Sequence, residues 1–160
     1  MNTTQMIPRT NRSQCIVTRD KKILMVTHAK KGRQWLCLPG GAIEESESPE
    51  EAAIRELHEE CHVEGVLIEK TSEYADPFSG GHTYTFLVEI GDQIPQLGKD
   101  PEDADNENPV LIHIGWYYLQ EICERDRAFL WAAGLLSIRE FAEELSRWGD
   151  DFSYPSVQMT

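Results

Sequence analysis

Short runs of apolar residues, separated by short polar segments, dominate the first quarter of the chain. Residues 14–18 (QCIVT) and 23–28 (ILMVTH) are two such runs, and the polar RDKK between them predicts a hairpin of two strands. The basic segment that follows, HAKKGRQ, predicts a loop. The next run, WLCLP, predicts a short strand that ends at Pro39 and the two glycines after it. An acidic loop, AIEESE, leads out of this region.

A helix start comes directly after the acidic loop. Ser48 suits the N-cap, Pro49 suits the first helical position, and Glu51 completes an S-x-x-E capping box. We therefore expect Glu51 to act in capping rather than in chemistry. The apolar residues that follow recur at helical spacing and form one stripe: Ala53, Ile54, Leu57 and Cys61. The acidic residues fall on another face, so the pattern predicts an amphipathic helix.

The second half of the chain alternates strand patterns with polar loops and then becomes helical. Residues 67–74, 83–90 and 110–119 predict strands, with DPFSGG as a turn and the acidic residues 92–109 as a loop. From about residue 125 to 148 the periodicity predicts one long helix. Its apolar stripe, which we expect to pack on the sheet, contains Phe129, Ala133, Leu136 and Phe141. Any exposed part of that stripe would suit a homodimer contact.

This order of elements predicts an α/β protein in which helices flank a mixed sheet, with α+β as the neighbouring class. We expect an N-terminal arm (residues 1–12), one domain (residues 13–148) and a C-terminal tail (residues 149–160). No apolar run approaches membrane-spanning length, and the first residues lack the apolar core of a signal peptide. The expected location is therefore the cytoplasm.

Charge narrows the expected partners. Asp and Glu number 28 against 15 Lys and Arg, and the formal net charge is −13. Nucleic-acid binding requires a basic surface, so we expect no nucleic-acid partner. An anionic small molecule held through a metal ion stays compatible, because the local charge then belongs to the metal. The cysteines lack metal-binding spacing and are expected to be free thiols: Cys15, Cys37, Cys61 and Cys123.

The densest acidic cluster lies in the segment RELHEE, residues 55–60. At about 100° per residue, Glu56, Glu59 and Glu60 fall on one helical face. Like charges at this spacing repel by about 0.2–0.5 kcal/mol per pair. The cluster is therefore either an ordinary solvated face, as in an interaction protein without Mg²⁺-dependent stability, or one wall of a cation site.

Residues 41–63 resemble the Nudix box, the pattern G-x5-E-x7-R-E-U-x-E-E-x-G-U in which U is a bulky aliphatic residue. The run WLCLPGG at residues 35–41 agrees, because a tryptophan followed by Pro-Gly-Gly commonly leads into this box. His62 departs from the pattern, since the family has glycine there. The residues in register are Gly41, Glu47, Arg55, Glu56, Leu57, Glu59, Glu60 and Val63.

The resemblance implies a Nudix-like α/β/α sandwich in which the box is a loop-helix-loop. It implies Mg²⁺-dependent hydrolysis, with Mn²⁺ as a substitute, of the pyrophosphate linkage between a nucleoside diphosphate and another group. Glu59 and Glu60 are then the principal metal ligands, and Glu56 is a ligand or the base that activates water. A backbone carbonyl near Gly41 is a further implied ligand. This donor set suits Mg²⁺, which prefers oxygen ligands.

Two other parts of the box are expected to support the site. Arg55 and Glu47 tend to pair in the family, fixing the loop against the helix, and we count them with the catalytic set. His62 stands where the family glycine adopts a left-handed backbone just past the helix end. A histidine there costs about 1 kcal/mol, unless the helix ends later, near Gly65. A structural substitution is the favoured interpretation of His62, ahead of a metal ligand.

Outside the box, candidate substrate contacts have structural alternatives. Lys31 and Arg33, with Lys30, would meet substrate phosphates or simply face solvent. Trp35 would stack on a nucleobase or pack in the core, and the same two interpretations apply to Tyr84, Phe86 and Trp116. A further acid is expected from the loop before the last strand, with Glu107 favoured over Asp103 and Asp105.

The box does not name the substrate, because many activities share one fold. Pro77 lies one residue from the place of a proline that marks many ADP-ribose hydrolases of this family. Nucleoside triphosphates, ADP-ribose-like molecules and dinucleoside polyphosphates stay open. A noncatalytic nucleotide sensor on the same fold is the alternative. Degraded glutamates would indicate such a sensor, and here they are intact. Isomerase chemistry would require acid–base residues that the sequence does not place.

Overall fold

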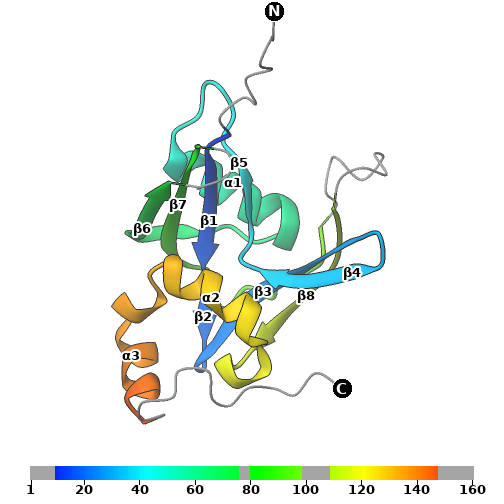
Figure 1. Cartoon of the computed structure of the whole chain (residues 1–160). Coiled ribbons are helices and arrows are strands. Elements are labelled where there is room, and N and C mark those ends of the chain that lie inside the picture. The colour runs from blue at the N-terminus through cyan, green and yellow to red at the C-terminus, as the bar shows by residue number, and fades with distance from the viewer. Residues whose placement is uncertain (1–9, 76–79, 99–108, 148–160) are drawn as a thin grey trace, which may run out of the picture.

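The computed structural model describes residues 10–75, 80–98 and 109–147 (Figure 1). Within these ranges the strands form two four-stranded sheets. The first sheet is mixed, because β1 and β7 run parallel while the two outer strands are antiparallel to their neighbours. Its strands, in order, are β5 (Gly40–Ala42), β1 (Arg12–Ile16), β7 (His82–Glu89) and β6 (Val66–Ala75).

The second sheet is antiparallel, and its central strand is β3. Its strands are β2 (Thr18–Arg19), β3 (Lys22–Lys30), β4 (Arg33–Cys37) and β8 (Val110–Tyr117). β8 pairs with β3 from Ile23 to Ala29, so β2 and β4 share the other edge of β3. The register with β8 shifts between Thr27 and His28, where β3 carries an irregularity.

Helices cover both faces of these strands (Figure 1). Helix α1 (Pro49–Cys61) covers one face. The other face is covered by η1 (Leu119–Glu121), α2 (Glu124–Ala132), η2 (Leu135–Ser137) and α3 (Arg139–Ser146). In β3, Leu24 and Val26 join the apolar core under α1, whereas Ile23 and Met25 join the core under the C-terminal helices. This alternation follows from the two-residue period of a strand, and the predicted α/β/α sandwich is confirmed.

The predicted hairpin of residues 14–18 with residues 23–28 is confirmed only next to its turn, where Thr18 pairs with Ile23. The first run divides between the two sheets: its first part lies in β1, which pairs with β5 and β7, and only the two residues of β2 pair with β3. Ile16 and Val17 are both fully buried but belong to different cores. A continuous apolar run does not show where the chain leaves one sheet and enters the other, because its residues are buried in both sheets.

The basic segment predicted as a loop is a β-hairpin. β3 extends to Lys30 and β4 begins at Arg33, and these two residues pair in the antiparallel register. Only Lys31 and Gly32 form the turn, with φ of 49° and 76°. Positive φ at both central residues suits the right-handed twist of the flanking strands, which explains the glycine.

The single long helix predicted for the C-terminal region is also wrong. α2 ends at Ala132, and Gly134 turns the chain with φ of 86° before η2 and α3. A Cβ on Gly134 would overlap the carbonyl oxygen of Thr71 in β6. The Thr71 hydroxyl also donates to the Ala133 carbonyl at 2.8 Å. Close approach of the chain to β6 therefore breaks the helix at this glycine.

The predicted apolar stripe of this region divides accordingly. Ala133 and Phe141 are fully buried, whereas Phe129 and Leu136 are 61% and 48% exposed. The predicted packing on the sheet thus holds for only half of the stripe.

At the N-terminal side, β1 begins at Arg12, and the Asn11 side chain accepts the His82 N–H at 2.9 Å. Asn11 and Arg12, which the sequence assigned to the arm, thus contact the first sheet. The predicted tail, residues 149–160, lies outside the described residues. In the described part of the chain, no helix is long and apolar enough to cross a membrane.

Candidate active site

Helix α1 begins as the capping pattern predicts. The Ser48 hydroxyl accepts the Glu51 N–H at 3.1 Å, and the Glu51 carboxylate accepts the Ser48 N–H at 3.4 Å. The capping box is therefore confirmed. Pro49 stands in the first turn, where its missing N–H removes no helical hydrogen bond. A fixed start sets the rotation of the helix and hence the direction of the carboxylates further along it.

The helix ends where the box places its glycine, and the alternative end near Gly65 is wrong. His62 is the C-cap with φ of 55° and ψ of 38°, the left-handed conformation in which glycine is usual. Two backbone donors from the loop after β7 satisfy terminal carbonyls: Gln96 donates to Cys61 at 2.9 Å and Gly98 donates to Glu60 at 2.8 Å. These bonds tie the carboxylate-bearing end of α1 to that loop.

Arg55 joins the box loop to the helix. Its Nε and Nη2 donate to the two carboxylate oxygens of Glu47 at 2.6 and 2.8 Å, so the predicted pair is present and bidentate. Nη2 also donates to the Ala42 carbonyl at 3.0 Å. Nη1 donates to Glu56 and Glu59 at 3.0 and 3.2 Å. The bonds from Arg55 are the main reason that the pKa of Glu47 lies below its usual range.

The three glutamates of the helix face meet different surroundings. Glu60 is only 4% exposed; its Oε1 accepts the Gly40 N–H at 2.7 Å, and its Oε2 lies 3.5 Å from His28 Nε2. Burial raises the pKa of Glu56 above its usual range, although the adjacent Arg55 opposes this shift. Glu59 is the most exposed of the three side chains. All three line one cavity of about 530 Å³.

The box loop closes one side of this cavity. Gly40 and Gly41 both line it, on β5. A Cβ on Gly41 would overlap the carboxylate of Glu56, so a side chain there would displace the glutamate. The glycine of the box is therefore required by close packing against one of the acids. The full lining among described residues is Arg12, His28, Trp35, Cys37, Gly40, Gly41, Ala42, Glu44, Arg55, Glu56, Glu59, Glu60 and Pro109.

A second wall comes from strands outside the box. Trp35 on β4 lies opposite His28 on β3, and their rings meet edge-on with centroids 6.1 Å apart. Trp35 thus borders the cavity, as the substrate interpretation requires. Phe86, by contrast, is buried in the core. Burial raises the pKa of the Cys37 thiol in this wall to about 12, so the thiol is not a candidate nucleophile.

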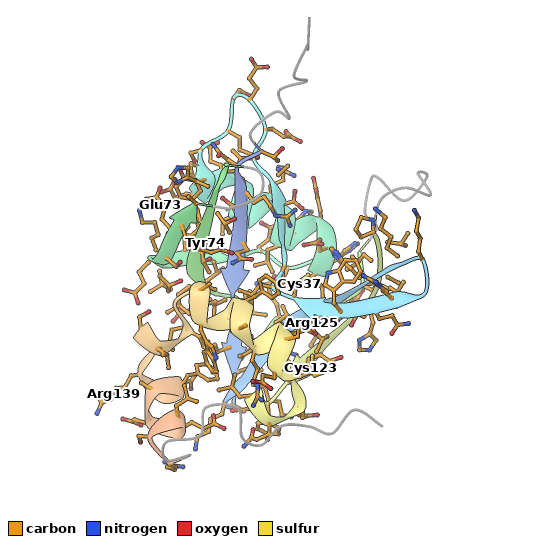
Figure 2. All side chains as sticks on the ribbon, viewed as in Figure 1. Cys37, Glu73, Tyr74, Cys123, Arg125 and Arg139 are labelled. Carbon is orange, nitrogen blue, oxygen red and sulfur yellow. The ribbon has the colours of Figure 1, made fainter. Side chains whose placement is uncertain are left out.

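Helix α2 holds the strand that carries Trp35. The Asp126 carboxylate, 5% exposed, accepts the Leu36 N–H at 3.1 Å, and Arg125 donates to the Gln34 carbonyl at 3.5 Å. Figure 2 labels Arg125 and Cys37 in this region, where α2 meets β4. These contacts restrain β4 on both sides of Trp35.

The cations predicted to meet substrate are not the ones that border the cavity. Lys31 and Arg33 are exposed at the β3–β4 hairpin and do not contribute to the described lining. Arg12, absent from the predicted set, does line it. The sequence alone could not place Arg12 at the cavity, because it reaches the box loop through the pairing of β1 with β5, where Arg12 lies opposite Ala42. Glu107 and the other two predicted loop acids, like Pro77, lie outside the described residues.

The donor chemistry fits a divalent cation of the Mg²⁺ type. Carboxylate oxygens from Glu56, Glu59 and Glu60 face one cavity, and such oxygens are the ligands that Mg²⁺ prefers. In residues 10–75, 80–98 and 109–147, no three His, Cys, Asp or Glu side chains already converge in a metal-binding arrangement. The geometry shows a cause, since Arg55 Nη1 bridges Glu56 and Glu59 and supplies positive charge between them. A metal ion bound here would take the place of Arg55 Nη1 as the positive charge nearest these two carboxylates.

Comparison with known proteins identifies the class. The family model of the NUDIX domain matches residues 8–137, which is most of the chain. The chain therefore belongs to the Nudix family.

A curated relative, diphosphoinositol polyphosphate phosphohydrolase 3-alpha of Mus musculus, is 31% identical over 87 residues, covering 54% of this chain and 50% of the relative. The human protein of the same name is 36% identical over 87 residues. The chain spans about half the length of these curated relatives. A solved NUDIX hydrolase of Nitrosomonas europaea matches 74% of this chain and 62% of its own with a TM-score of 0.61 and 22% identity. That likeness shows the fold.

Proposed function

We propose that this protein is a Mg²⁺-dependent hydrolase that cleaves the pyrophosphate linkage of a nucleoside diphosphate joined to another group. One observation carries the proposal: the three glutamates Glu56, Glu59 and Glu60 line one cavity, on a helix braced by Arg55 and Glu47. A solvated acidic face would have neither the buried carboxylate of Glu60 nor a brace that directs the cluster inward. The intact glutamates also favour an enzyme over the noncatalytic nucleotide sensor.

In this proposal Glu59 and Glu60 hold the metal, with Glu56 and a backbone carbonyl near Gly41 as further candidates. The metal, when bound, neutralises phosphoryl oxygens and lowers the pKa of a bound water. The Gly40 N–H fixes the orientation of the Glu60 carboxylate toward the cavity.

Glu56 is the favoured base. Its half-buried carboxylate has a raised pKa, and a raised pKa makes a carboxylate a better proton acceptor near neutral pH. Water would attack one phosphorus of the P–O–P linkage and transfer a proton to Glu56. The bond from that phosphorus to the bridging oxygen would break, and the second phosphate would leave. Arg55 and Glu47 keep the helix and loop in place without touching the reacting atoms.

The wall of the cavity that strands outside the box form, here called the strand wall, contains Arg12, His28, Trp35 and Cys37. This wall favours a substrate that carries a nucleobase. Trp35 presents an aromatic side chain at the cavity, which suits stacking on a base. The described lining contains two cations, Arg12 and Arg55, and the second is engaged by three glutamates. A densely phosphorylated ring would need more free cations. The names of the curated relatives nevertheless make a diphosphoinositol polyphosphate the second candidate, since its pyrophosphate linkage has the same chemistry.

The deciding experiment is a substrate panel with and without Mg²⁺, repeated with Mn²⁺. The panel contains nucleoside triphosphates, oxidised guanine nucleotides, ADP-ribose, diadenosine polyphosphates, NADH and a diphosphoinositol polyphosphate. We expect metal-dependent release of a mononucleotide or phosphate from one nucleotide member. Turnover of the inositol compound alone would replace the nucleotide proposal. Nucleotide binding without any turnover would instead identify a sensor. The cytoplasmic location and the homodimer expected from the sequence stay predictions.

A further inference from the structure

Two of the described arginines line the cavity, and they differ in what they contact. Arg55 is engaged by carboxylates of the box through both ends of its guanidinium. Arg12 forms no ion pair within the described residues, although Glu44, Glu56 and Glu59 line the same cavity. A guanidinium that borders several carboxylates without pairing with them keeps its hydrogen-bond donors available.

Strand pairing places Arg12 beside the box. It is the first residue of β1, where it lies opposite Ala42 on one side and Thr83 on the other. Arg12 lines the same cavity as Glu56 on the helix and Cys37 on β4. Its charge favours the ionised form of both groups, because it acts to lower the pKa of each against the larger effect of burial.

An anionic substrate needs such a group. Among the described residues, four glutamates line the cavity, Glu44 among them, and an approaching phosphate is repelled by each of them. A metal held by the helix acids offsets this repulsion at one point only. Of the two lining arginines in the described part of the chain, Arg12 is the one that carboxylates do not already neutralise. A guanidinium fork matches two phosphate oxygens at once.

We propose that Arg12 is a substrate-binding residue of this protein that contacts a phosphate. Its guanidinium binds a substrate phosphate from the first sheet, beside the box loop, while the helix acids face the linkage to be cleaved. This inference rests on the proposed function, and it replaces Lys31 and Arg33 as the expected phosphate ligands. Those two side chains lie at the exposed hairpin, away from the described lining.

The test compares Arg12→Gln and Arg12→Lys with the control Arg33→Gln, which removes an exposed charge of the same kind. With the substrate found in the panel, Arg12→Gln should raise KM about 10–100-fold, the usual effect of losing a charge-assisted hydrogen bond. The effect on kcat should be smaller. Arg12→Lys should restore part of the affinity, because it keeps the charge but not the fork. Arg33→Gln should leave KM within about twofold, as expected for a surface charge.

A second readout separates this inference from the proposed function. Calorimetric titration with ADP, in the presence of Mg²⁺, measures phosphate binding without turnover, and thermal unfolding checks that each variant is folded. If the wild type binds ADP but cleaves nothing, weaker binding by Arg12→Gln than by Arg33→Gln still supports the contact. If Arg12→Gln matches Arg33→Gln in both KM and ADP affinity, the contact does not exist. Should Arg12→Gln fail to fold, Arg12→Lys carries the same comparison.

Discussion

The two walls of the cavity are built in different ways. The helix wall, with Glu56, Glu59 and Glu60, comes from one continuous segment whose side chains are fixed by local contacts such as the Arg55–Glu47 pair. The strand wall is assembled from β1, the β3–β4 hairpin and the residue before β8, which are three separate parts of the sequence. Local construction suits a chemistry that needs fixed acids, whereas separate strands can vary without disturbing them. We therefore expect the helix wall to determine the reaction and the strand wall to determine the substrate.

The most direct test of the different roles of the two walls is to neutralise one acid of the helix wall. Glu59→Gln or Glu60→Gln should lower kcat on the order of 10²–10³-fold, the usual cost of losing one electrostatic contact that stabilises a transition state. The fold should persist, as far-ultraviolet circular dichroism would show. Near-wild-type kcat in either variant would mean that the metal assignment is wrong.

A change in the strand wall should instead alter substrate binding. Trp35→Leu keeps an apolar side chain next to His28 but removes the stacking surface. Because base–aromatic stacking contributes about 1–3 kcal/mol, KM for a nucleotide substrate should rise by about 10-fold, with kcat affected less. Steady-state kinetics on the substrate from the panel measures both constants. An unchanged KM would show that Trp35 acts only in packing.

The helix wall also contains acids that should leave chemistry untouched. Glu51→Ala removes one half of the capping box and should lower the free energy of unfolding by about 1 kcal/mol, while kcat stays close to that of the wild type. Urea denaturation followed by fluorescence measures the first, and the substrate assay measures the second. A lower kcat with unchanged stability would mean that Glu51 takes part in the reaction and that its capping role is not its main one.

The smallest expected effect concerns the end of the same helix. In His62→Gly, relief of the left-handed backbone gains about 1–2 kcal/mol, and the greater freedom of glycine in the unfolded chain costs about 0.4–1 kcal/mol. The net result should be about 0.5–1 kcal/mol of added stability, seen in denaturation as a higher midpoint with an unchanged slope. A loss of stability would indicate that the stacked His58 and His62 rings contribute more than the backbone strain costs.

Sequence could predict the helix wall because its signals are local. Capping at Ser48 and the common face of the three glutamates depend on spacing within one helix, whereas the pairing of Arg55 with Glu47 was expected from the resemblance to the Nudix box. The layered α/β/α order could be predicted from the same kind of pattern. The division of residues 14–18 between two sheets could not be predicted, because the residues are buried in an apolar core on either side.

The strand wall could not be predicted for a related reason. Arg12 reaches the cavity through the pairing of β1 with β5. The local sequence predicts neither the partner strand nor the register of that pair. Gly134 is a similar case: a lone glycine in a helical pattern is tolerated in many helices, and only the approach of Thr71 makes it a break here. The hairpin at Lys31 and Gly32 was the one missed feature with a local signal, a glycine in a two-residue turn.

The contacts from α2 to β4 have a consequence beyond the placement of Trp35. β4 is an outer strand of its sheet, and an uncovered strand edge presents unpaired N–H and C=O groups that another chain can add to. Asp126 accepts the Leu36 N–H and Arg125 donates to the Gln34 carbonyl, so one helix terminus occupies both kinds of group along this edge. The same two side chains therefore protect the protein from edge-to-edge aggregation at the strand that borders its cavity.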